Sequence, residues 1–510
     1  MRRTTLKLVA APLLVALAGC VVGPDYAPPG FEFPTNWANA PAEAHASSPS
    51  VSLDAWWRAF ADPTLNQLIE EAVAGNASVA SAKAKIREAR ATRREAGGAL
   101  APSLTGSASA SESGGAQASA SGASTAAASS VSSPFEAGLD ASWDLDLFGG
   151  NSRGLEAAVY GEQATEEDLN AALLTLVGDV GAYYAEARGD QARVALARRT
   201  DASERHTADL TRAKFEAGKT SAADVAKADA VAASTAADIP TYEADYAEAV
   251  HRLSVLTGRA PGALIDTMKS AGAIPSARKP LPTGVPADVL RRRPDVRAAE
   301  RRVAQATGKI GVKEAALYPD LSLTGSLSTA ATRPGDLLRA SSVSWSYGPS
   351  LSLPIFDGGK LAAERDVAEA QRDEYLVAWR SSVLTALEDV ENALVFLGKE
   401  RVRAQALAKA VEGYGKAVEL SRDQYEAGKS SFLDVLDAER SLYTAEDSLI
   451  QSRVAIAKDY VALAKALGGG WSRPVDADAP EIVDADTAPR WRRETTGKSM
   501  DGASEAHATP

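Results

Sequence analysis

The sequence predicts a mainly helical fold with a transmembrane β component, built from a unit that occurs twice: two strands followed by a long helical hairpin. Three observations predict this fold class. Part of the sequence recurs at an offset of 210 residues, the separation of Phe215 from Tyr425. Several segments alternate between apolar and polar residues, as strands do. Two long segments contain no proline, which permits very long helices.

The repeat is clearest around two glycines. Residues 215–225 are FEAGKTSAADV and residues 425–435 are YEAGKSSFLDV. Beyond each block an apolar residue recurs at every seventh position, from Val225 to Leu253 and from Val435 to Leu463. Such a pattern predicts packed helices with a left-handed supercoil. Chance similarity of two alanine-rich helices does not explain matched strands and turns in the same order, so we interpret the repeat as an internal duplication.

The strand-like segments form one pair in each half. Odd positions of residues 135–147 are apolar, and residues 343–355 alternate in the same way. Residues 100–111 and 317–328 repeat the pattern more weakly. Alternation over about a dozen residues predicts strands that can cross a membrane when tilted. A soluble β-sandwich is the alternative that alternation alone leaves open. On the membrane interpretation, the acids of the first segment face a water-filled interior: Glu136, Asp140, Asp144 and Asp146.

Four strands per chain cannot close a barrel, and open strand edges are not tolerated in lipid. Because the smallest membrane barrels have about eight strands, strand counting predicts an oligomer. Two chains would give eight strands, too narrow for an open conduit, and three would give twelve. The sequence by itself permits either count.

The helices supply the length of the molecule. Residues 152–216 are expected to form one helix ~100 Å long, at ~1.5 Å per residue. Gly218 and Gly428 fit the turns of two long hairpins, because glycine accepts left-handed geometry at helix ends. Pro240 is expected to interrupt the first returning helix and to kink it. Shorter helices are expected over residues 63–76, 78–95, 286–292 and 295–316.

The N-terminal residues predict export and lipidation. Arg2, Arg3 and Lys7 precede a short apolar run, and small residues precede Cys20, the single cysteine of the chain. These features are typical of a secretory signal. Cleavage before Cys20 would let that residue carry acyl chains, which anchor a protein in lipid without a spanning helix. An incidental buried cysteine is the alternative.

We divide the chain into six parts on these grounds. They are a signal peptide (1–19), a lipidated N-terminal segment (20–62), a first repeat (63–257), a connector (258–284), a second repeat (285–470) and a poorly ordered tail (471–510).

Composition and motifs argue against several kinds of function. The net charge of −12 disfavours nucleic acid as a partner. The four histidines show no metal-ligand spacing and no glycine-rich phosphate loop occurs, so we expect no metal, no cofactor and no enzymatic activity. Any driving force must therefore come from a partner.

Several motifs resemble the TolC/OprM class of outer-membrane efflux proteins, in its NodT-like lipoprotein branch. They occur in the family's order over about residues 20–470: CVVGPDY at 20–26, WRAFADPTL at 57–65, WDLDLFG at 143–149, RRPDVRAAERR at 292–302 and LPIFDGG at 353–359. The resemblance implies a homotrimer with a 12-stranded β-barrel and a periplasmic α-helical barrel. It also implies a location in the outer membrane of a Gram-negative bacterium, with the protein anchored in lipid and extending into the periplasm.

The resemblance further implies a gated aperture at the second hairpin. Asp434-Val-Leu-Asp437 matches the family's aperture signature, and a spacing of three places both carboxylates on one helical face. In a trimer six carboxylates would surround one constriction and favour cations. A solvated acidic helix face is the alternative from spacing alone. Tyr425 and Asp224 correspond to residues that latch the closed aperture through a charge-assisted hydrogen bond, whereas a basic latch residue of some relatives is replaced by Ser430.

The function implied is a passive outlet duct for small molecules in a tripartite efflux system. Its partners would be an inner-membrane resistance-nodulation-division pump and a periplasmic adaptor that contacts the hairpin tips at Gly218, Lys219, Gly428 and Lys429. The duct of an ATP-driven type I protein secretion system is one alternative. A structural coiled-coil lipoprotein without transport is another. The cargo stays open, because selectivity in such systems resides largely in the pump.

Overall fold

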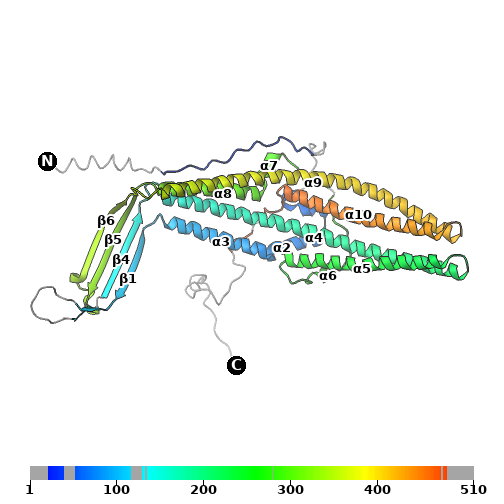
Figure 1. Cartoon of the computed structure of the whole chain (residues 1–510), viewed down its shortest axis with the longest axis horizontal. Helices are drawn as coiled ribbons and strands as arrows, with labels where there is room; N and C mark the ends of the chain where they lie inside the picture. The colour runs from blue at the N-terminus through cyan, green and yellow to red at the C-terminus, as the bar shows by residue number, and fades with distance from the viewer. Residues whose placement is uncertain are drawn as a thin grey trace, which may run out of the picture.

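A computed structural model of the chain describes residues 21–39, 52–116, 129–132, 135–277, 279–472 and 475–478. The predicted signal peptide, Cys20 and most of the predicted tail lie outside the described residues. The described part is elongated, with a β-sheet at one end and the tips of two helical hairpins at the other (Figure 1). It is mainly helical, as the sequence predicts.

The same order of elements occurs twice. The first set is α2 (Pro63–Gly75), α3 (Ala77–Gly98), β1 (Ser103–Ala110), β4 (Phe135–Asp144), α4 (Gly150–Glu216) and α5 (Ala222–Leu256). The second set is α7 (Pro286–Arg292), α8 (Pro294–Ala315), β5 (Asp320–Ala331), β6 (Val343–Ser352), α9 (Lys360–Glu426) and α10 (Phe432–Ala466). Both α4 and α9 have 67 residues, and both α5 and α10 have 35. The duplicated unit is therefore confirmed in three dimensions.

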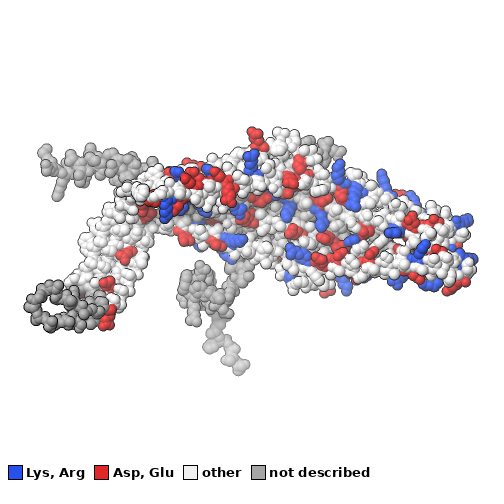
Figure 2. All heavy atoms as spheres, in the orientation of Figure 1, with Lys and Arg blue, Asp and Glu red and all other residues white. Residues whose placement is uncertain are grey.

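The sheet is antiparallel with strand order β1-β4-β5-β6. Its register gathers apolar residues on one face: Leu139 pairs with Leu327, which pairs with Trp345. On the other face Asp140 lies between Thr105 and Ser326. The apolar face is exposed, with Trp345 70% accessible. Figure 2 shows few charged side chains over the sheet and many over the helices.

The end of β4 corrects one prediction. The strand stops at Asp144, so Asp146 is not on the alternating polar face with the other acids. Asp146 has a φ of +45°, and its carboxylate accepts hydrogen bonds from the N–H groups of Asn151 and Ser152, each at 2.8 Å. The first N–H groups of a helix have no partner within the helix, and a nearby carboxylate satisfies them. Asp146 therefore fixes the start of α4, and Asp144 hydrogen-bonds to Asn151 at 2.9 Å.

Two further expectations differ from the structure in detail. The low-complexity segment after β1 contains two short paired strands, β2 (Ser113–Ala116) and β3 (Ser129–Ser132), and residues 117–128 lie outside the described part. Helix α5 continues through Pro240 without the expected interruption. None of the helices in the described part of the chain has the length and hydropathy of a membrane span.

Near the sheet the helices form a single layer in the order α3-α4-α8-α9. Farther from it, α4 packs against α5 and α10, and α10 against α9. The largest core surrounds the middle of the molecule, where Trp56 and Trp57 of the 3-10 helix η2 (Leu53–Phe60) are each 1% exposed. A short helix, α6 (Ile265–Met268), lies in the predicted connector and contributes Met268 to the same core.

Small residues let the long helices approach one another closely. A Cβ on Gly189 of α4 would lie 2.2 Å from a methyl carbon of Val454 on α10. Valine is stiff at χ1 in a helix, so the methyl group cannot easily rotate away. The distance between α4 and α10 therefore depends on the absence of a side chain at Gly189.

We predict that Gly189→Ala lowers the free energy of unfolding by about 1–3 kcal/mol, because the added methyl group overpacks this contact. The measurement is denaturant unfolding of the detergent-solubilised protein, followed by circular dichroism. Gly413→Ala on exposed α9, where no atom lies within 4 Å of the added Cβ, is the matched control. It should raise helix stability by up to about 1 kcal/mol. Shifts of the same sign in both variants would contradict the proposed close contact.

Candidate functional site at the hairpin tips

Both hairpins turn in the same way. Gly218 and Gly428 have φ values of +70° and +72°. The residue after each glycine donates its N–H to the carbonyl five residues back, at 2.8 Å in the first turn and 2.7 Å in the second. Each glycine N–H donates to the carbonyl three residues back, at 2.8 and 3.0 Å. This is a Schellman motif, which requires a left-handed residue at the position of the glycine.

The residues that follow the glycines are presented to solvent. Lys219 and Lys429 are exposed at the two tips, and Figure 2 shows basic and acidic side chains intermingled there. Ser430 is half-buried, and its hydroxyl lies 3.4 Å from the carbonyl of Ser421. Each hairpin tip therefore presents one exposed lysine, and the preceding glycine turn fixes the backbone position of that lysine.

Asp434 and Asp437 are both exposed on the first two turns of α10. The carboxylate of Asp434 accepts hydrogen bonds from the N–H and the hydroxyl of Ser431, each at 2.9 Å. It therefore also completes a capping box at the start of α10. Phe432 and Val435 face the opposite way and are buried. The two acids consequently point away from the hairpin core, as a ring around a pore requires.

Asp224 performs the same capping task at the start of α5. Its carboxylate accepts hydrogen bonds from the hydroxyls of Ser221 at 2.7 Å and Thr220 at 2.9 Å. These hydroxyls hold the pKa of Asp224 below its ordinary value.

Tyr425 is buried between the hairpins. Its hydroxyl lies 3.3 Å from Oγ1 of Thr211, and the Lys214 ammonium lies 3.6 Å from the centre of its ring. Burial lowers the pKa of Lys214. Because Asp224 is occupied at the helix cap and Tyr425 binds Thr211, the predicted hydrogen bond between Tyr425 and Asp224 is not formed within one chain.

A buried polar network, which sequence reasoning missed, joins the two hairpins behind the tips. Glu439 of α10 is 6% exposed and accepts hydrogen bonds from Arg422 of α9 at 2.5 and 2.9 Å. It also accepts one from Thr207 of α4 at 3.0 Å. Arg422 donates to Ser203 of α4 as well. These contacts tie the second hairpin to the long helix of the first.

The repeat itself contains the signal for this network. Arg212 and Asp229 of the first hairpin are 210 residues before Arg422 and Glu439, and they also form an ion pair, at 2.8 Å. Both partners of the first pair are about half exposed, whereas Glu439 is buried because α4 covers it. The paired charges could have been found from sequence. The burial of Glu439 could not have been found in this way.

Glu204 of α4 lies beside this network and is 4% exposed. Its Oε2 has no hydrogen-bond partner among the described residues. Burial raises the pKa of Glu204 to about 7, the Thr235 hydroxyl partly opposes this, and Glu439, Asp201 and Asp238 raise it further. Glu204 is thus protonated below neutral pH and charged above it.

We predict that Glu204→Gln makes stability less dependent on pH. A carboxyl whose pKa is about 7 in the folded state and about 4.5 in the unfolded state binds more protons when folded. The free energy of unfolding therefore falls as pH rises from about 4.5 to about 7, by roughly 3 kcal/mol for this group. Glutamine resembles the protonated form, so the variant should be more stable relative to the parent at pH 7.5 than at pH 5.

Melting temperatures of parent and variant at the two pH values provide the measurement. Glu216→Gln, an exposed position on the same helix, is the control and should show no such dependence. A difference between parent and Glu204→Gln that is the same at both pH values would contradict the assignment.

No group of three or more His, Cys, Asp or Glu side chains in the described part of the chain is arranged to hold a metal ion. The exposed acids Glu136 and Asp140 lie on the polar face of β4, far from the hairpin tips (Figure 1). The tip residues offer carboxylates, ammonium groups and a fixed turn shape. This combination suits ion selection and protein contact.

Comparison with known proteins agrees with this architecture. The sequence model of the family described as outer membrane efflux protein matches residues 68–259 and 285–469. Nodulation protein T of Rhizobium leguminosarum bv. trifolii is 36% identical over 456 residues, which are 89% of this chain and 96% of that protein. The pyoverdine export outer membrane protein OpmQ of Pseudomonas aeruginosa is 32% identical over 92% of this chain and 98% of its own length.

A solved structure of the outer-membrane channel OprN superimposes with a TM-score of 0.82 at 36% identity, covering 89% of this chain and all of that one. The family consists of channel and efflux proteins rather than enzymes, and its members lie in the outer membrane of Gram-negative bacteria and extend into the periplasm. The chain described here belongs to the outer membrane efflux protein family.

Proposed function

We propose that this chain is the outlet duct of a tripartite efflux system and conducts small molecules passively across the outer membrane. The observation that carries the proposal is the direct continuity of two parts. The sheet has an exposed apolar face, and its strands β4 and β6 lead into the helices α4 and α9, each of 67 residues and ~100 Å long. A membrane-facing sheet joined to helices of that length fits a conduit that spans both the membrane and the periplasm.

The complete duct is a homotrimer in this proposal. Among the described residues, strands β1 and β6 each have one edge without a partner strand, and such edges must be paired in lipid. Three copies of the four-stranded sheet close a twelve-stranded barrel. The alternating faces then put Trp345 and Leu327 toward lipid, and Glu136 and Asp140 toward the lumen.

The position of the first described residues supports lipidation at Cys20. The N–H of Val22 donates to the carbonyl of Phe148 at 3.1 Å, where β4 passes into α4. Arg153 donates to the carbonyl of Gly23 and pairs with Asp25 at 2.7 Å. Val21, the residue that follows Cys20 in the sequence, therefore lies at the boundary between sheet and helices, where the inner surface of the outer membrane would lie. Acyl chains on Cys20 would reach that surface directly.

The partners are a periplasmic adaptor and an inner-membrane pump of the resistance-nodulation-division class. The two hairpin tips point away from the sheet, so they would reach farthest toward the inner membrane (Figure 1). The turns at these tips contain Lys219 and Lys429. We also propose the repeat boundaries 63–257 and 285–470, with residues 258–284 as the connector between them.

One prediction of the proposed function concerns the aperture. Replacing both acids in Asp434→Ala/Asp437→Ala should raise single-channel conductance in planar bilayers severalfold and reduce the preference for cations, because a ring of carboxylates is removed. The matched control is Asp423→Ala/Glu426→Ala, which removes two exposed acids with the same spacing from the other side of the same turn. Equal effects of the two double variants would contradict the aperture. Absence of conductance in every variant would contradict the duct and favour a structural lipoprotein.

Another prediction of the proposed function concerns the adaptor. Lys219→Glu/Lys429→Glu should weaken crosslinking to the adaptor about tenfold, because opposite charge at both tips opposes an interface formed with the lysines. Lys409→Glu, at an exposed position on α9 away from the tips, should leave crosslinking at the parental level. Retention of full crosslinking by the tip variant would exclude this surface as the docking site.

A further inference from the structure

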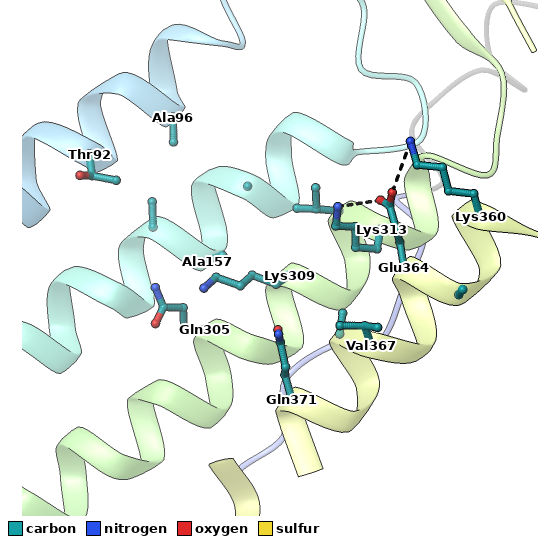
Figure 3. A pocket seen from close by; sticks show the side chains of 15 residues that line it. Thr92, Ala96, Ala157, Gln305, Lys309, Lys313, Lys360, Glu364, Val367 and Gln371 are labelled. Atoms are coloured by element: carbon teal, nitrogen blue, oxygen red, sulfur yellow. Dashed lines mark hydrogen bonds and ion pairs between the residues drawn. The ribbon is translucent and has the colours of Figure 1, made fainter. Parts of the chain in front are cut away.

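A pocket of about 780 Å³ lies in the helical layer close to the sheet, and side chains from α3, α4, α8 and α9 line it (Figure 3). These four helices pack side by side in a single layer. A pocket lined by all four must therefore lie on one face of the layer. Which face it occupies decides whether it is in contact with molecules that pass through the duct.

The N-terminal segment, residues 21–39, lies on the opposite face. The Tyr26 hydroxyl donates to Glu300 of α8 at 2.8 Å, and a Cβ on Gly23 would lie 2.5 Å from the Cα of Gly311. Nine residues separate Glu300 from Lys309, a pocket residue, and at about 100° per residue they turn the helix by two and a half turns. The N-terminal segment and the pocket thus contact opposite sides of α8.

This arrangement shows which face of the helical layer is the outer wall of the duct and which faces the lumen, on the basis of the function proposed above. The segment follows the lipid-anchored Cys20, and an anchor in the membrane cannot start from inside the duct. The face that carries the segment is therefore the outer wall. The pocket opens into the lumen, just below the level of the membrane.

The pocket is positively charged, although the chain has a net charge of −12. Lys309, Lys313 and Lys360 line it together with a single carboxylate, Glu364. Lys313 pairs with Glu364 at 2.9 Å and Lys360 approaches it at 3.9 Å. Lys309 has no ion-pair partner among the residues that the structure describes, and Figure 3 shows its ammonium beside Gln305 and Ala157.

The rest of the lining is mostly apolar. Ala157, Val312 and Val367 contribute to it, and Val367 is 57% exposed. A ligand that fits both features has an anionic head and an apolar body. We propose that this pocket is a transit site for amphipathic organic anions, whose carboxylate or sulfonate group binds Lys309 while the apolar part contacts Val312 and Val367.

The test uses the full-length protein in planar bilayers, with the Asp434→Ala/Asp437→Ala background to keep the aperture open. The probe is octane-1-sulfonate, and octyltrimethylammonium is its matched cation of equal chain length. The sulfonate should block the current at a concentration at least about fivefold below that of the ammonium compound. Lys309→Gln should raise the half-blocking concentration of the sulfonate about five- to tenfold, because a charge-assisted contact is lost. Lys399→Gln, on exposed α9 outside the pocket, should leave it unchanged.

Equal block by both probes, or an unchanged value in Lys309→Gln, would overturn the proposal while leaving the duct intact. A second measurement does not depend on conductance. Lys309→Cys should react with 2-sulfonatoethyl methanethiosulfonate, detected as an increase in mass over the parent treated identically. Failure to react would show that a neighbouring chain covers the pocket, which would also overturn the proposal. Reaction without conductance in any variant would count against the duct, and therefore also against a transit site in it.

Discussion

The close approach of long helices through small residues is the constraint on which the rest of the structure depends. Glycine at 189 and 308, with alanine at 157, brings α4 near α10 at one level and near α8 at another. Near the sheet, where α4 meets α8, the helices α3, α4, α8 and α9 lie side by side as a single layer with two faces. One face of that layer holds the N-terminal segment and the other holds the cationic pocket. If these helices instead surrounded a thick core, one face of each would be buried, and the segment and the pocket could not lie on opposite faces.

Helix boundaries could be predicted from the sequence because local chemistry determines them. Proline begins α2 and α7, and a left-handed glycine ends α4 and α9, each within a few residues of the expected position. The alternation of residues 135–147 correctly predicted β4 and its two faces. It could not predict that the strand stops at Asp144. Asp146 caps the next helix, and in the sequence such an aspartate looks the same as one that faces a lumen.

In the candidate site too, some features could be predicted from the sequence and others could not. Gly218 and Gly428 follow from the repeat, and the exposure of Asp434 and Asp437 follows from their place in a helix start. The burial of Glu439 and Tyr425 depends on how α4 lies against the second hairpin, which no local pattern contains. The two hairpins therefore have similar residue types at these equivalent positions, and they differ mainly in which other helices pack against those residues. The carboxylate of Asp229 is solvated in the first hairpin, whereas that of the equivalent Glu439 is enclosed in the second.

The N-terminal segment has a consequence for the order in which the molecule forms. Its hydrogen bonds join residues 131, 274 and 353 positions apart, so its binding surface exists only after the second repeat has been synthesised and folded. Contacts so distant in sequence form late, because the loop they close must first be ordered. A lipidated N-terminus would meanwhile keep the unfinished chain at the membrane surface. Encounter between subunits would then take place by diffusion in two dimensions, and docking of this segment would mark a finished subunit.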